Sequence, residues 1–221
     1  MSERHAARWA GAAFLGLFAA ASATQLRAFW WDTTALHRSM LDFQAHRKFL
    51  MGGGFARMAL AFPLAVLALE LPRLAGDGLR ARTGGAMLGA AAIASAVAGV
   101  GQVVMGVPAE EYVRAGAVDH AIETLADSFY WLQDNLVTLS LVGLGVAAVA
   151  LTPRLGRPLL VWTSRLAIAG ALLTAGALML NAPDSRNSPL YVPAFSVAVV
   201  TTFVWVAAAS VVSVRGPAPA P

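Results

Sequence analysis

The chain has 221 residues, of which 58% are hydrophobic and 13% are charged, and its mean hydropathy is +0.65. This composition lies outside the usual range of soluble domains and predicts an integral membrane protein. The sequence has no cysteine, which excludes disulfides, thiolate metal ligands and a cysteine nucleophile, and the formal charge of +4 is not gathered into a basic stripe that would suit a nucleic acid.

Apolar runs of membrane-spanning length recur along the whole chain. A run of about 20 residues is needed for a helix to cross roughly 30 Å of hydrocarbon. None of the runs shows the alternating pattern of barrel strands, so we expect helices. The sequence therefore predicts an all-α, polytopic membrane bundle forming a single domain over residues 1–221, with a short disordered tail over 215–221. The expected spans cover residues 6–26, 50–71, 85–107, 130–151, 158–181 and 190–214.

The basic residues beside the spans predict the orientation in the cell membrane. One side carries Arg4, Arg8, Arg73, Arg80, Arg82, Arg154, Arg157 and Arg215, whereas the other carries Arg27, Arg38, Arg47, Lys48, Arg114 and Arg186. By the positive-inside rule, the first set is cytoplasmic, and so are both termini. The first run also reads as a signal peptide, whose cleavage would leave five spans; we expect it to be retained because it continues to Leu26.

Two of the outer loops have helical patterns. Residues 33–49 place Leu36, Met40 and Phe43 at helical spacing, and residues 117–129 place an apolar stripe beside an acidic one. Both segments are expected to form short amphipathic helices at the outer interface.

The third span, residues 85–107, consists mostly of small residues. Small side chains let neighbouring helix backbones approach closely and gain van der Waals contact. This span is therefore expected at the centre of the bundle, or at an interface with a second copy of the chain or with a larger membrane complex.

Two charged residues stand inside the expected spans. Arg57 lies about seven residues into the second span and Asp134 about five residues into the fourth, so both fall in the outer third of the membrane. An isolated charge there costs at least a few kcal/mol, which predicts an Arg57–Asp134 pair, joined by Gln102 and Asn135.

This predicted pair has two interpretations. One is a structural salt bridge that fixes helix packing. The other is a polar cavity open to the outer face, rimmed by His46, Arg47, His120 and Glu123.

A second charged pair is predicted toward the cytoplasm. Glu70 ends the second span, and Arg165 lies about seven residues into the fifth. Arg165 has an alternative, since its long side chain can carry the charge to the interface while its stem stays in apolar surroundings.

Metal and cofactor motifs are absent from the sequence. His120 and Glu123 stand three residues apart, but there is no HExxH pattern, no histidine-rich cluster and no histidine inside a span. There is also no GxSxG turn, aspartate-rich motif or phosphate-binding glycine loop. We therefore expect no metal and no cofactor.

The arrangement of spans and loops resembles that of uncharacterised bacterial membrane families of about this length, with six spans, a long first outer loop and a basic fourth loop. The stretches that carry the resemblance are "LDFQAHRKFLMGGGFARMALAF" and "LGRPLLVWTSRLAIAG". The resemblance implies a fold and no catalytic residues.

Three functions remain open from the sequence. The first is a non-enzymatic membrane protein that binds a small amphipathic ligand or lipid headgroup, or docks as an accessory subunit. The alternative is an intramembrane enzyme acting on a lipid or isoprenoid at the outer leaflet, with Asp134 as acid or base, His46 or His120 as proton relay and Arg57 holding an anionic group. The third is a small solute transporter, which would show an inverted repeat.

Overall fold

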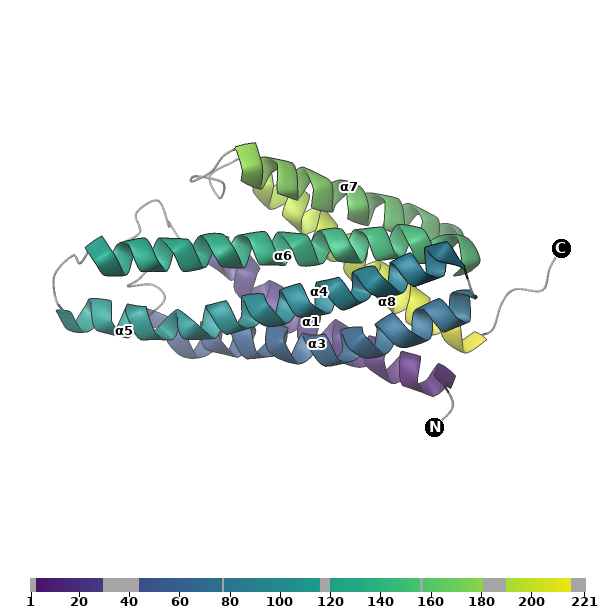
Figure 1. The fold of residues 1–221 in the computed structure, drawn as a ribbon, viewed down its shortest axis with the longest axis horizontal. Helices are drawn as coiled ribbons and strands as arrows, with labels where there is room; N and C mark the ends of the chain where they lie inside the picture. The colour runs from purple at the N-terminus through teal and green to yellow at the C-terminus, as the bar shows by residue number, and fades with distance from the viewer. Residues whose placement is uncertain are drawn as a thin grey trace.

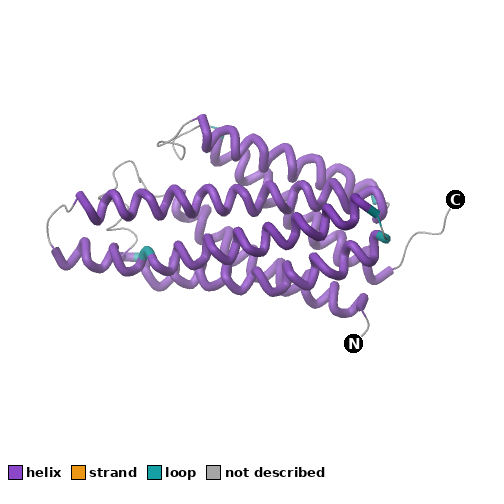
Figure 2. The backbone as a smooth tube through the Cα atoms, viewed as in Figure 1, coloured by secondary structure: helices purple, strands orange, loops and turns teal. Residues whose placement is uncertain are grey.

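A computed structural model describes residues 3–29, 44–76, 78–115, 120–155, 157–180 and 190–215. The described residues are almost entirely helical and include no strand, which confirms the all-α prediction (Figures 1 and 2). The helices are α1 (Glu3–Phe29), α3 (Arg47–Ala75), α4 (Leu79–Val104), α5 (Gly106–Ala115), α6 (His120–Leu155), α7 (Pro158–Leu180) and α8 (Tyr191–Arg215). Within these ranges the chain has six helical segments long and apolar enough to cross a membrane, one of which joins α4 to α5.

The long helices form a closed ring. Going around it, α1 packs on α3, α3 on α4, α4 on α6, α6 on α7, α7 on α8 and α8 back on α1, while α3 and α8 also reach α6 across the middle. The first helix begins and the last ends at the same end of the bundle (Figure 1). The core between the helices is apolar, and its fully buried side chains include Phe14, Leu64, Leu88, Leu144 and Trp205.

The predicted outer loops differ from the structure. Residues 108–115, expected in a loop, belong to helix α5, because Pro108 stands in its first turn, where its missing N–H is not needed. The segment 120–129 is not a separate interfacial helix but the beginning of α6, since no proline or glycine interrupts the chain before Gly143. The other predicted helix covers residues 33–49, of which residues 33–43 lie outside the described part of the structure.

As a consequence, α5 and the start of α6 lie side by side and project past the end of α7 (Figure 1). A helix of 36 residues such as α6 is about 54 Å long, well beyond the hydrocarbon thickness. Met105 and Tyr112 form a small apolar core under this projection together with Leu50, and Phe129 packs against it. An ion pair of 2.7 Å between Arg47 and Glu110 ties the start of α3 to α5.

The third predicted span is not central. Helix α4 buries its small residues, among them Ala98 and Gly99, while Ile93, Val97 and Val100 on the opposite face are 69%, 45% and 45% exposed. The small residues serve instead to bring α4 against α3, as expected from their lack of bulk. The prediction of an interface with a second copy concerns the exposed face and stays a prediction.

Candidate functional site

The two charged residues predicted inside the spans both lie in the interior of the ring. Arg57 and Asp134 are each 4% exposed, on α3 and α6 respectively. Arg57 stands ten residues after the start of α3, about 15 Å along the helix axis. Asp134 and Tyr191, at the start of α8, both lie within electrostatic reach of the guanidinium.

Arg57 also links three helices through hydrogen bonds. Its Nη2 donates to the backbone oxygen of Ala21 in α1 at 3.4 Å, and its own backbone oxygen accepts from Ser95 Oγ of α4 at 3.4 Å. Both bonds are long, so each contributes little alone. Together they join α3 to α1 and to α4 at Arg57.

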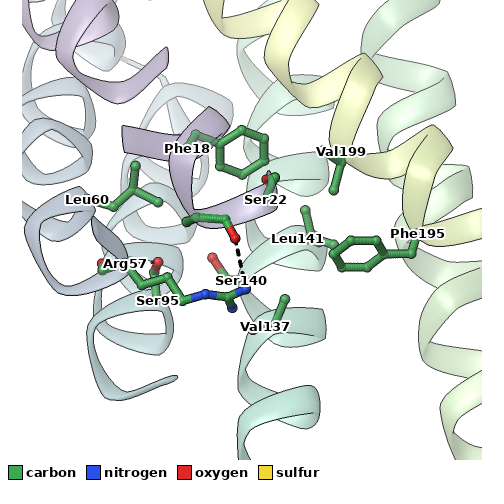
Figure 3. Close-up of a pocket in the computed structure, with 11 residues that line it drawn as sticks. Phe18, Ser22, Arg57, Leu60, Ser95, Val137, Ser140, Leu141, Phe195 and Val199 are labelled. Carbon is green, nitrogen blue, oxygen red and sulfur yellow. Dashed lines mark hydrogen bonds between the residues drawn. The ribbon is translucent and has the colours of Figure 1, made fainter. Parts of the chain in front are cut away.

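A small cavity adjoins the guanidinium (Figure 3). Its volume is about 30 Å³, which is enough to hold water. Polar side chains from four helices line it: Ser22 of α1, Arg57 of α3, Ser95 of α4 and Ser140 of α6. Figure 3 shows the guanidinium reaching from α3 toward Ser140 and Val137.

The rest of the cavity lining is apolar. Phe18, Leu60 and Phe195 are among these residues. Of the polar lining residues, Ser140 donates to the backbone oxygen of Ala91 at 3.1 Å, which holds α6 against α4. The cavity is thus lined mainly by apolar side chains, with polar side chains on several sides, and is large enough for a group the size of water.

Two residues predicted to join the pair bind backbone groups instead. Gln102 Nε2 donates to the oxygen of Leu50 at 2.8 Å, fixing α4 to the beginning of α3, and Asn135 Nδ2 donates to Trp131 of its own helix at 2.8 Å. Neither side chain lines the cavity. The sequence prediction had missed the three serines and Tyr191, because single polar residues in an apolar run give no periodic signal.

His46, one of the residues proposed for the outer rim, does not line the cavity. His46 is half-buried directly before α3, which is 11 residues or about 16 Å of helix from Arg57. The side chains of His120 and Glu123 lie outside the described part of the structure. A rim formed by these residues remains a prediction.

The structure does not bring Glu70 and Arg165, the second predicted pair, together. Glu70 accepts from Arg73, one turn later on the same helix, at 3.3 Å. Arg165 lies over the ring of Trp162 at 5.8 Å from its centroid and is exposed. The physical reason is the ring order, in which α3 and α7 are not neighbours. Arg165 instead gains a cation–π contact on the outer face of α7.

These features define a class: an all-α bundle of six membrane-length helical segments with a buried arginine and aspartate beside a small polar cavity. In the described ranges, no group of three or more His, Cys, Asp or Glu side chains could hold a metal ion. Comparisons with protein-family models, with curated proteins and with solved structures found no match for this chain. The site alone therefore indicates the function.

Proposed function

We propose that the chain is a multi-pass integral membrane protein that binds a small hydroxylated, amphipathic ligand at the Arg57 cavity and performs no chemistry on it. The membrane location is supported by large apolar side chains exposed midway along the helices. Leu139, Leu173 and Val200 are 57%, 62% and 60% exposed, a surface that lipid would cover. With both termini cytoplasmic by the arginine distribution, the cavity would lie in the outer half of the bilayer.

The convergence of four polar side chains from four helices on one cavity carries this proposal. Polar and charged groups inside a membrane are expensive, and they mark functional sites by default. One ion pair could be met by α3 and α6 alone, whereas the serines of α1 and α4 are not needed for it. The presence of these two serines at the same cavity favours a site that binds a ligand.

The charges at the cavity select the class of ligand. Arg57 is already opposed by Asp134, so an anionic ligand would compete with a carboxylate for the same guanidinium. A neutral hydroxyl group can accept from the arginine and donate to a serine oxygen without disturbing that balance. The volume of about 30 Å³ admits the hydroxyl-bearing end of such a ligand, and the apolar walls suit the beginning of its alkyl chain.

The geometry favours binding over the enzymatic alternative. Asp134, the residue proposed as acid or base, is not among the side chains that line the cavity. The accessory-subunit and transporter roles stay predictions.

The proposal predicts that filling the cavity abolishes ligand binding. We expect 1,2-hexanediol at ten times its dissociation constant to stabilise the wild-type protein by about 1.4 kcal/mol, or roughly 4 °C in the unfolding midpoint. Ser22→Leu places a branched apolar side chain in the cavity and should lose this shift. Thermal unfolding of the purified protein in detergent measures it.

The matched control is Ala19→Leu on the same helix, where the residue is exposed and the added atoms face outward. This variant should keep the full shift. Equal shifts in all three proteins would mean that the diol acts as a solvent, and the ligand site would be rejected.

A further inference from the structure

A second cavity lies at the opposite end of the bundle, as an apolar groove between α7 and α8. We propose that this groove holds an acyl chain of one anionic phospholipid, whose phosphate is bound by Arg157. The groove has a volume of about 570 Å³ and is formed by the first residues of α7, including Leu159, and by Val204, Ala207, Ala208 and Val211 of α8. The proposal rests on the membrane location but is independent of any ligand at Arg57.

The groove arises from the way the two helices cross. They approach each other closely at Gly170, where an added Cβ would lie 2.8 Å from the backbone nitrogen of Ala198. About ten residues further along α8, the side chains facing the gap are Ala207 and Ala208, which are too short to fill it. These small residues therefore leave an open groove between α7 and α8 at this end of the bundle.

The helices that form the groove are held together by buried hydrogen bonds beside it. Trp205 is 1% exposed, and its Nε1 donates to Thr152 Oγ1 at 2.9 Å. Thr152 Oγ1 in turn donates to the backbone oxygen of Leu160 at 3.4 Å. This chain of contacts ties α8 to the end of α6 and the start of α7, so the groove is already formed before any lipid arrives. Preorganisation of this kind lowers the entropy lost on binding.

The walls suit a hydrocarbon chain. Apart from Arg157, every lining residue is apolar. The volume lies within the range of roughly 300–1,000 Å³ that is common for ligand pockets. Because the groove opens on the side of the bundle that lipid would cover, an acyl chain can enter it without crossing water.

The charge at the mouth selects an anionic headgroup. Arg157 is exposed at the beginning of α7, and neither α7 nor α8 contains an acidic residue. The same end of the bundle carries the exposed Arg80 and Arg82 at the start of α4. By the positive-inside rule this end faces the cytoplasm, where anionic lipids attract basic residues with about 1 kcal/mol per arginine.

Native mass spectrometry of the purified protein tests the proposal, with phosphatidylglycerol and phosphatidylcholine of identical acyl chains as probes. The wild type should bind one phosphatidylglycerol about fivefold more tightly than phosphatidylcholine. Arg157→Gln, an exposed substitution that leaves the fold intact, should bind both lipids equally. Ala208→Phe fills the groove and should lose the tight site for both.

The control is Val200→Phe, which adds a ring to an exposed position of the same helix and should bind as the wild type does. An Arg157→Gln protein that keeps its preference would overturn the headgroup assignment. An Ala208→Phe protein that folds and still binds one lipid tightly would overturn the groove. A groove filled by a second copy of the chain would appear as a dimer that excludes lipid, and it would equally overturn the proposal.

Discussion

Asp134→Asn is expected to destabilise the protein by about 3 kcal/mol, or roughly 10 °C in the unfolding midpoint. The substitution keeps the size of the side chain but removes the negative charge that acts on Arg57. Arg57 is 4% exposed, so its charge would remain in the interior without that compensation, where an unpaired charge costs several kcal/mol. The midpoint in detergent and the amount of protein in the membrane should fall together.

Glu111→Gln is the matched control for this change of carboxylate to amide. Glu111 pairs with Arg114 on the surface of α5 at 2.7 Å, with its side chain 51% exposed, and such pairs contribute little to stability. The control should therefore unfold within about 2 °C of the wild type.

A double-mutant cycle decides whether Arg57 and Asp134 act as a unit. Removing both charges, with Arg57→Met and Asp134→Leu, should be far less harmful than the sum of the two single changes, because no uncompensated charge remains. Strictly additive losses would show that the two residues do not depend on each other, and the pairing would be abandoned.

The spans could be predicted because the thickness of a bilayer fixes the length of an apolar helix. The ends of the helices could not, since beyond the bilayer that constraint disappears. Helix α6 continues from His120 because nothing in the sequence breaks it, although its first ten residues read as an amphipathic segment of their own. Hydropathy measures where a helix can be buried and gives no information on how far it projects into water.

The centre of the site was predictable and its surroundings were not. Arg57 and Asp134 stand out because charge is rare in an apolar run. Ser95 and Ser140 do not, since a serine in a helix can bond to its own backbone and needs no partner. Side chains can pair only between neighbouring helices, and the sequence does not reveal which helices are neighbours. Glu70 and Arg165 could therefore be considered as a pair although α3 and α7 are not adjacent in the ring.

Gly99→Ala is expected to destabilise the protein by about 2 kcal/mol, although alanine favours helices more than glycine does. A Cβ at Gly99 would lie 2.5 Å from the backbone oxygen of Gly54 and 2.8 Å from the backbone nitrogen of Met58. Both atoms belong to the main chain of α3 and cannot turn away. The methyl group can be accommodated only if α3 and α4 move apart, which forfeits packing along their whole contact.

Gly101→Ala on the same helix provides the comparison. No atom lies within 4 Å of the Cβ that would be added there, so the substitution should be neutral or stabilising by up to about 1 kcal/mol. Two identical changes, two residues apart, thus carry opposite expected signs. Thermal unfolding of both variants measures the difference, and equal midpoints would show that the close approach of α3 and α4 does not limit stability.

The Gly99→Ala variant also links the packing of α3 on α4 to the proposed site. Gly99 contacts α3 beside Met58, the residue that follows Arg57, and Ser95 of α4 bonds to the Arg57 backbone one turn away. Moving the helices apart would lengthen a bond that is already 3.4 Å and would widen the cavity. Gly99→Ala should therefore weaken the stabilisation by 1,2-hexanediol, whereas Gly101→Ala should retain it. A Gly99→Ala protein with lower stability but an unchanged diol response would separate the cavity from the packing of α3 on α4.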